Sequence, residues 1–295
     1  MASGVLTMNP ILGSRAVSHS CVNMTKKCSL LWSPTQDTLQ SEYTTAFTAL
    51  SRTNLWFIAS AMVKSKILKQ LRKQLDKAEK IENPVQYVEE TKRPKFQLDE
   101  QSRERNGSPV ATQSLSYVPS EDLSEEDLDS CLNLFRANMG QMYLDSSWGL
   151  DMTKKAAEFQ HRKARFVLIH QINSNAEDNH DIGISDRPVT ASTLAAFVHF
   201  RFEYDDNDDP STIVLYIYEI QVAEAYRRKG LGQKLMALME QIGCAVQMSK
   251  ILLTVFKKNT QAMQFYTEKL CYGVDESSPS KFGKFADYEI LSKPL

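Results

Sequence analysis

One segment, residues 213–234, constrains the fold of this chain more than any other. Eight of its first ten residues are aliphatic or tyrosine, as expected of a buried strand. A turn rich in glycine and basic residues follows, and a helical pattern begins within it. A buried strand that leads through a glycine turn into a helix predicts an α/β fold, in which helices pack on a sheet.

The turn itself predicts a binding site for a pyrophosphate. Gly230 and Gly232 let the backbone approach a ligand closely. Free N–H groups at the start of a helix, together with the helix dipole, bind phosphate. Leu235 stands where a Rossmann fingerprint needs its third glycine, and the Gly-Lys-Ser or Gly-Lys-Thr of a P-loop is absent. The alternative is an ordinary turn with a basic cap.

Hydrophobic periodicity predicts the other elements. Strands are expected at 110–118, 165–170, 194–204, 212–222, 251–256 and 288–292. Helices are expected at 151–161, 230–248 and 260–270, and from an N-cap at Ser120 or Ser124 to Met142. Residues 173–188 are polar and irregular, as expected of a surface insertion. The order of elements predicts a mixed α/β (α+β) fold.

The N-terminal third differs in composition from the rest. Residues 1–60 are rich in serine and threonine and hold only two acidic residues, which suits a disordered extension or an organelle transit peptide. Residues 61–82 predict an amphipathic helix with seven basic residues between Lys64 and Lys80. That helix could contact the ribosome or chromatin, or pack on the domain. Residues 83–109 predict a linker, and residues 110–295 predict the main folded domain.

Composition argues against several classes of site. The net charge of −1 points to no partner. The five cysteines are odd in number and lack a C-x-x-C spacing, which predicts reduced thiols rather than a disulfide framework or a zinc site. The five histidines are scattered, so we expect no metal. The sequence has no run of about 20 apolar residues, the length that a membrane-spanning helix needs.

The turn resembles the R/Q-x-x-G-x-G/A signature of the GCN5-related N-acetyltransferases. That resemblance implies a mostly antiparallel sheet flanked by helices, a bulge in the preceding strand, and acetyl-CoA as the cofactor. Tyr266 lies near the thiolate-side tyrosine position of that superfamily. The cofactor-binding positions implied are Gln221, Val222, Ala223, Arg227, Arg228, Lys229, Gly230, Leu231, Gly232, Gln233, Lys234, Asn259 and Tyr266.

Other motifs are similar to the N-alpha-acetyltransferase D family within that superfamily. They are Met142-Tyr143, Ser147-Trp148-Gly149, Phe200-Arg201-Phe202, and residues 215–219, 253–257, 275–280 and 288–291. The resemblance implies a monomeric enzyme of nucleus and cytoplasm that acetylates tails beginning Ser-Gly-Arg-Gly, those of histones of the four and two-A classes. The peptide pocket that it implies is Tyr143, Trp148, Tyr216, Tyr218, Thr254 and Tyr288, with Tyr218 and Tyr288 also catalytic.

Glu219 is the candidate general base. It is the only charged residue between Ile213 and Val222, and an ionised carboxylate in an apolar strand is costly without a partner. An amine must lose its proton before it attacks a thioester, and a nearby carboxylate can take that proton. Strict alternation would put Glu219 and Tyr218 on opposite faces of the sheet. The alternative is an edge-strand glutamate that faces solvent.

Two acids in the turn after residue 202 complete the candidate site. The resemblance implies that Glu203 and Asp205 contact an arginine of the substrate tail, and the alternative is a solvated turn. Two rival functions remain open. One is a lysine or broad N-terminal acetyltransferase with the same fold, and the other is a non-catalytic module that docks on nucleic acid.

Overall fold

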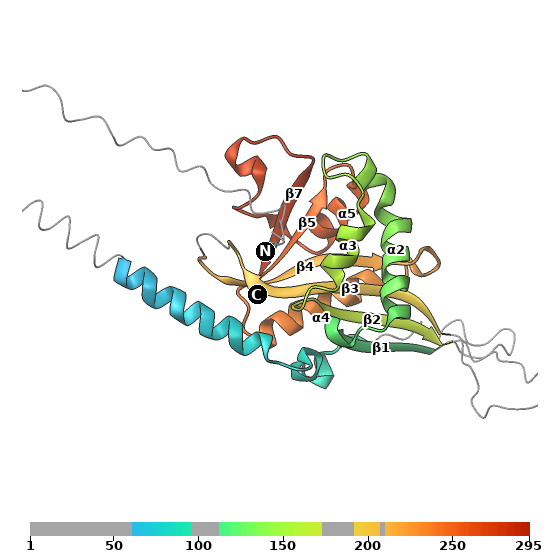
Figure 1. Ribbon diagram of the computed structural model, residues 1–295, viewed down its shortest axis with the longest axis horizontal. Coiled ribbons are helices and arrows are strands. Elements are labelled where there is room, and N and C mark those ends of the chain that lie inside the picture. Colours follow the sequence, from blue (N-terminus) through green and yellow to red (C-terminus); the bar gives the residue numbers. More distant parts are fainter. Residues whose placement is uncertain (1–60, 96–111, 173–191, 207–209) are drawn as a thin grey trace, which may run out of the picture. The chain divides into compact units, whose positions relative to one another are not determined.

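The computed structural model describes residues 61–95, 112–172, 192–206 and 210–295. These residues divide into two units, one with residues 61–74, 206, 210 and 211, and one with the remaining described residues. The second unit holds a seven-stranded sheet in the order β1-β2-β3-β4-β5-β7-β6 (Figure 1). The strands are β1 (Thr112–Pro119), β2 (Arg165–Ile172), β3 (Ser192–Tyr204), β4 (Ile213–Val222), β5 (Lys250–Phe256), β6 (Gly273–Val274) and β7 (Tyr288–Pro294).

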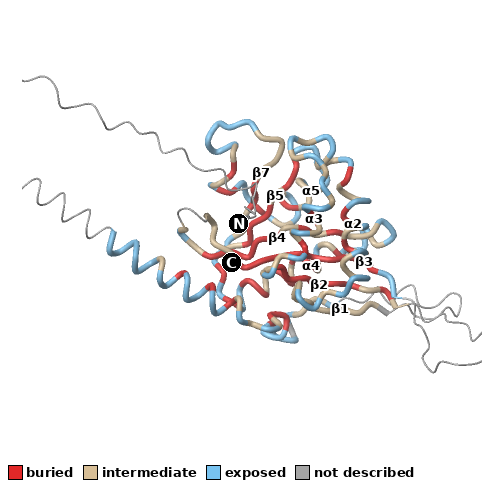
Figure 2. Tube along the Cα trace, in the orientation of Figure 1, coloured by how far each residue is buried: buried red, intermediate tan, exposed pale blue. Residues whose placement is uncertain are grey.

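The sheet is antiparallel except where β4 pairs with β5 in parallel. The predicted mixed α/β fold, with a mostly antiparallel sheet flanked by helices, is therefore confirmed. The tube in Figure 2 shows buried residues concentrated along the central strands. Among the described helices, none is both long and apolar enough to cross a membrane.

Helices α2 (Glu125–Leu144) and α3 (Met152–Phe159) cover one face of the sheet. The Ser124 side chain accepts a hydrogen bond from the Asp127 N–H and caps α2, and Asp151 caps α3 in the same way. Each cap satisfies an N–H that a helix start leaves without a partner. The core below these helices contains Cys131, Phe135, Phe159, Ala164, Phe166, Leu168, Leu194 and Phe197.

Helix α4 (Leu231–Ala245) packs on the opposite face. Gly243 of α4 lies against Ile251 of β5, since a Cβ built at this glycine would be 3.5 Å from the Ile251 side chain. Ile251 pairs with Leu215 of β4, so Leu215 shares the face that α4 covers. The buried residues of α4 include Leu235, Met236 and Met239. The helix that the sequence predicts at 260–270 is interrupted, since α5 (Thr260–Gln264) leads directly into a π-helical turn, η6 (Phe265–Lys269).

Strand β4 contains the irregularity that shapes the site. His199 of β3 pairs with Glu219, but the next residue, Phe200, pairs with Ile217, so the β3–β4 register skips Tyr218, which is the extra residue of a bulge. Such a bulge bends the strand and changes which side chains share a face. The parallel pairing of β4 with β5 ends at Ile217, although β4 continues to Val222. The two strands therefore diverge after the bulge.

The predicted basic helix is present at residues 61–79. Leu71, Leu75 and Ala78 are buried, while Ile67 is exposed. The segment predicted as a linker is partly ordered, since it forms two 3-10 turns, η1 (Pro84–Tyr87) and η2 (Glu90–Lys92). Val85 and Val88 are buried there, so this segment packs on other residues, which its prolines did not predict. The extension at 1–60 and the insertion at 173–188 lie outside the described residues.

Candidate active site

A buried ion-pair triad lies where α3 meets β4. Lys155 Nζ lies 2.9 Å from Glu219 Oε1 and 2.9 Å from Glu158 Oε1. Gln221 Nε2 donates to the other oxygen of Glu219 at 2.8 Å. The side chains of Lys155 and Glu219 are only 8% and 6% exposed, so both charges depend on this pairing. The triad therefore has one positive and two negative groups.

Burial controls the acid–base properties of the triad. Desolvation raises the pKa of the Glu219 carboxyl above its ordinary value, and the Lys155 ammonium opposes that rise. Burial acts to lower the pKa of Lys155, but the attraction of Glu219 and Glu158 outweighs it, so the pKa of Lys155 is raised. Lys155 is thus held protonated, and Glu219 can accept a proton more readily than an exposed glutamate.

A chain of hydrogen bonds joins Glu219 to the basic turn. Beyond Gln221, Asn138 of α2 donates to Gln221 Oε1 at 2.9 Å and to the Val222 carbonyl at 3.2 Å. Arg227 donates to Asn138 Oδ1 and, at 3.1 Å, to the Val222 carbonyl. The candidate base and the first residue of the signature are therefore connected through two side-chain amides.

Aromatic side chains surround one side of the triad. The Trp148 ring lies 5.9 Å from the Tyr143 ring, 5.0 Å from the Tyr288 ring and 4.9 Å from the Phe256 ring. The Tyr143 hydroxyl accepts a hydrogen bond from Lys155 at 3.4 Å, so this aromatic cluster reaches the triad. Three of the predicted pocket residues, Tyr143, Trp148 and Tyr288, are thereby brought together.

The other predicted pocket residues form a second group along β4 and β5. The Tyr216 hydroxyl lies 2.6 Å from the Thr254 hydroxyl, and the centres of the Tyr216 and Tyr218 rings are 4.8 Å apart. Tyr216 pairs with Arg201, which donates to the Glu158 carbonyl of α3, and Glu219 accepts from Lys155 of α3, so both side chains face α3. The Tyr218 ring stacks on His199 at 4.9 Å, so the bulge puts Tyr218 on that face as well.

Glu203 near the end of β3 and Asp205 just after that strand have different surroundings. The Tyr218 hydroxyl donates to Glu203 at 3.1 and 3.0 Å, and Arg201 lies 3.9 Å away. Burial raises the pKa of Glu203, although Arg201 acts against the rise. Asp205 accepts a hydrogen bond from the Thr212 N–H at 3.0 Å and so helps to close the turn. Glu203 faces the aromatic residues, whereas Asp205 serves the hairpin.

The basic turn forms the start of α4. Gly230 is the N-cap residue and is left-handed, with φ 77°, which glycine adopts without strain. The first helical hydrogen bond runs from the Lys234 N–H to the Gly230 carbonyl. The N–H groups of Leu231, Gly232 and Gln233 precede that bond, so they project from the helix start as an anion site requires. Arg227, Arg228 and Lys229 are exposed beside them.

The last two predicted cofactor residues lie on α5 and η6. Asn259 accepts a hydrogen bond from the Ala262 N–H and caps α5. Its contact with the cofactor stays a prediction. Tyr266 is buried, and burial together with the nearby Glu219 carboxylate raises the pKa of its hydroxyl. Since Glu219 acts on Tyr266 electrostatically, the π-helical turn lies close to the triad.

Sequence reasoning missed Lys155, Asn138 and His199. Lys155 precedes the buried Phe159 by four residues, and that spacing on one helix face was the available signal. His199 is fully buried between the rings of Phe166, 5.0 Å away, and Tyr218, 4.9 Å away, and burial keeps its pKa low. Nothing in the sequence distinguishes this histidine from one on a surface strand.

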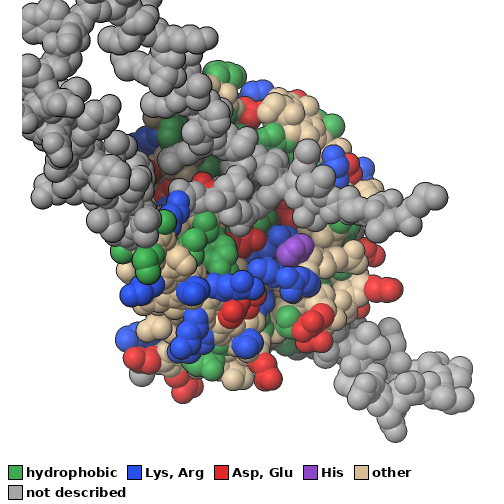
Figure 3. All heavy atoms as spheres, turned by 60° about the vertical axis from the view of Figure 1, so that its left-hand side comes forward, with side chains coloured by type: hydrophobic (Ala, Val, Ile, Leu, Met, Phe, Trp, Pro, Cys, Tyr) green, Lys and Arg blue, Asp and Glu red, His purple; other side chains and the backbone are tan. Residues whose placement is uncertain are grey.

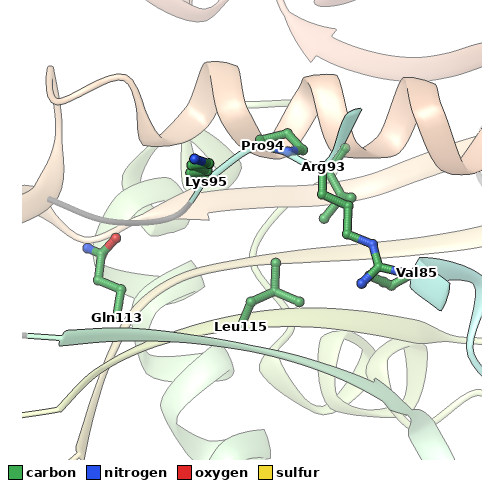
Figure 4. A pocket seen from close by; sticks show the side chains of 7 residues that line it. Val85, Arg93, Pro94, Lys95, Gln113 and Leu115 are labelled. Carbon is green, nitrogen blue, oxygen red and sulfur yellow. The ribbon is translucent and has the colours of Figure 1, made fainter. Parts of the chain in front are cut away.

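A separate cavity of about 460 Å³ lies elsewhere in the fold (Figure 4). Val85 and Arg93 line it from the segment after the basic helix, and Gln113 and Leu115 line it from β1. None of the predicted site residues lines this cavity. Within the described ranges, no three His, Cys, Asp or Glu side chains are placed to hold a metal ion.

Residues 150–271 match the model of the acetyltransferase (GNAT) family, which places this segment in the GNAT superfamily. Solved structures that the fold resembles include NAA60 of Arabidopsis thaliana in complex with a bisubstrate analogue, at 14% identity and a TM-score of 0.41, over 62% of this chain and 99% of that one. An acetyltransferase from Streptococcus agalactiae has 14% identity and a TM-score of 0.42, over 62% and 98%. The ribosomal-protein-S18-alanine N-acetyltransferase of Escherichia coli has 16% identity and a TM-score of 0.36, over 62% of this chain and 94% of that one. Likenesses of this extent say nothing about the substrate.

Proposed function

We propose that this chain is an acetyl-CoA-dependent N-acetyltransferase that acetylates the free N-terminal amine of histone tails beginning Ser-Gly-Arg-Gly. One observation carries the proposal. The bulge at Tyr218 turns Glu219 toward the aromatic residues and leaves the end of β4 without pairing from β5. A carboxylate, a cluster of aromatic side chains and a strand edge not paired with β5 therefore meet at one place. The match of residues 150–271 to the GNAT family supports the same chemistry.

The residues present fit acetyl-CoA. The left-handed Gly230 and the projecting N–H groups of Leu231, Gly232 and Gln233 suit a pyrophosphate, and three exposed basic residues precede them. Pairing of β4 with β5 ends at Ile217, so on that edge backbone groups of residues 219–221 can hydrogen-bond to the amides of the pantetheine arm. Acetyl-CoA supplies the acetyl group as a thioester when it is bound.

Glu219 removes the proton from the substrate amine, directly or through a water. An α-amine has a pKa of about 8, so a base with a raised pKa suits this transfer near neutral pH. Tyr266 keeps its proton at neutral pH, since tyrosine ordinarily has a pKa of about 10 and burial raises that of Tyr266 further. It can therefore donate a hydrogen bond to a departing thiolate. Tyr218 and Tyr288 lie on the face of the sheet where the amine would be held.

Glu203 favours arginine at the third position of the substrate. Its carboxylate is half-buried, accepts from Tyr218 and lies 3.9 Å from Arg201, a distance longer than a hydrogen bond. A substrate guanidinium can add charge-assisted hydrogen bonds to this carboxylate. Because Arg201 already offsets part of the charge, we expect an effect at the lower end of the roughly 2–5 kcal/mol typical of a desolvated interfacial pair.

The test compares kcat/KM on three peptides with acetyl-CoA. They are Ser-Gly-Arg-Gly, Ser-Gly-Ala-Gly, and a lysine peptide with a blocked N-terminus. About 2 kcal/mol corresponds to a preference of about 30-fold for the first over the second. Glu203→Ala should erode that preference, whereas Asp129→Ala, an exposed acid on α2, should not.

Equal rates on the first two peptides would contradict the proposed selectivity and leave a broad N-terminal acetyltransferase. Faster acetylation of the blocked peptide would identify a lysine acetyltransferase instead. No turnover, with affinity for nucleic acid that falls steeply with salt, would identify a binding module that acts through the basic helix. On the part of the surface that Figure 3 draws in colour, a row of Lys and Arg side chains has Asp and Glu side chains next to it.

A further inference from the structure

The buried Lys155 has no part in the chemistry described so far. Its ammonium touches Glu219, Glu158 and the Tyr143 hydroxyl, and it lies 4.6 Å from the centre of the Phe135 ring. Lysine is almost never fully buried unless it is paired, and the desolvation of each ion costs several kcal/mol. Replacing a buried ion pair with apolar residues is often neutral or stabilising, so stability alone does not account for this lysine.

We propose that Lys155 is a positioning residue for acetyl transfer, which orients the Glu219 carboxylate and keeps it ionised, and that Glu158 limits this effect by sharing the same ammonium. The inference rests on the proposed role of Glu219 as general base. Lys155 binds one carboxylate oxygen and Gln221 the other, so the plane of the carboxylate is fixed from both sides. A base held in one geometry loses less rate to misorientation.

The surroundings of the triad leave these three charges dominant. The other polar or titratable side chains that face it are Tyr143 on α2, His199 and Arg201 on β3, Gln221 on β4 and Tyr266 on η6. Burial raises the pKa of both tyrosines and lowers that of His199, so all three are neutral near pH 7. Arg201 is charged, but it donates to the backbone carbonyl of Glu158 rather than to the carboxylates.

The two neighbours act on Glu219 in opposite directions. The Lys155 ammonium lowers the pKa of Glu219, and the Glu158 carboxylate raises it. Removing the ammonium should therefore raise the pKa of Glu219, and removing the carboxylate should lower it. A purely structural role for Lys155 predicts neither shift. This opposition of sign makes the proposal testable without reliance on the size of either effect.

The experiment measures kcat/KM for the Ser-Gly-Arg-Gly peptide against pH at saturating acetyl-CoA. Deprotonation of the substrate amine gives one acid limb common to all variants, and the profile steepens below the pKa of Glu219. In Lys155→Met this break should move to higher pH by about one to three units, the range for loss of an opposite charge within 4–6 Å. In Glu158→Gln it should move to lower pH. Lys155→Arg keeps the charge and should leave the break near that of the parent protein.

Lys154→Met is the matched control, because Lys154 is the adjacent residue and its side chain is 86% exposed. It should not move the break. Circular dichroism checks folding, and Glu158→Gln keeps the test open if Lys155→Met does not fold, because Glu158 is 29% exposed. An unmoved break in the folded variants, or shifts of the same sign, would overturn the proposal. Near-normal kcat in Glu219→Gln would instead reject the proposed base.

Discussion

Alanine at the two signature glycines should affect stability and cofactor binding in different ways. Gly230 has φ 77°, and alanine in a left-handed conformation costs about 1–2 kcal/mol. Gly232 has a helical conformation, and a Cβ there would lie 3.6 Å from Phe265 and 4.0 Å from Val222, both ordinary contacts. Alanine is more favourable than glycine within a helix by up to about 1 kcal/mol. Gly230→Ala should therefore lower the free energy of unfolding, and Gly232→Ala should leave it equal or higher.

Cofactor affinity should respond even where stability does not. The new methyl group of Gly232→Ala would occupy space that the proposed pyrophosphate needs next to the helix start. Losing one hydrogen bond to a charged group costs about 1.5–3 kcal/mol, which is about 10- to 150-fold in Kd. Calorimetry with acetyl-CoA measures the affinity, and thermal denaturation measures the stability.

Gly140→Ala provides the control for both measurements. Gly140 lies within α2, where a Cβ would meet its nearest neighbours at 3.7 Å, so it should gain helix stability without any change in cofactor affinity. Unchanged affinity in a folded Gly232→Ala protein would show that the cofactor does not approach this turn. Greater stability in Gly230→Ala than in Gly232→Ala would refute the backbone argument itself.

Glu219→Gln should lower kcat by about 10²–10⁴-fold with calorimetric affinity for acetyl-CoA retained; near-normal turnover would place the base elsewhere. Leu75→Ala, at a position 4% exposed, should lower the free energy of unfolding in urea by about 2–5 kcal/mol, whereas the exposed Ile67→Ala should have little effect; equal effects would contradict the packing. Burial acts to raise the pKa of Asp275, but hydrogen bonds, the largest from Lys250, hold it at about 2. The stabilisation by the ionised Asp275 should be complete above about pH 4 and be lost as pH falls toward 2. The free energy of unfolding of Asp275→Asn should therefore fall less between pH 4 and 2 than that of the parent protein; parallel curves for the two proteins would contradict this.

Local signals predicted the elements well where the chain itself supplies them. Ser124 was a candidate cap and does cap α2, and the apolar run from Ile213 to Val222 is β4. The sequence did not reveal that Lys155 is buried, because its partner Glu219 lies 64 residues further along the chain. Periodicity identifies which face of a helix is apolar, but the partner of a polar residue on that face depends on tertiary contacts.

The bulge at Tyr218 shows why one residue matters more than the surrounding pattern. In a regular strand Glu219 would share a face with Ile217, whose register partner Phe200 lies on the face that α4 covers. The carboxylate would then lie away from Lys155 and from the aromatic residues. With one extra residue, Glu219 instead shares a face with Tyr216, and β4 separates from β5 at the same point. The orientation of the proposed base and the open backbone for the proposed cofactor therefore have a single structural cause, and neither glycine nor proline marks it in the sequence.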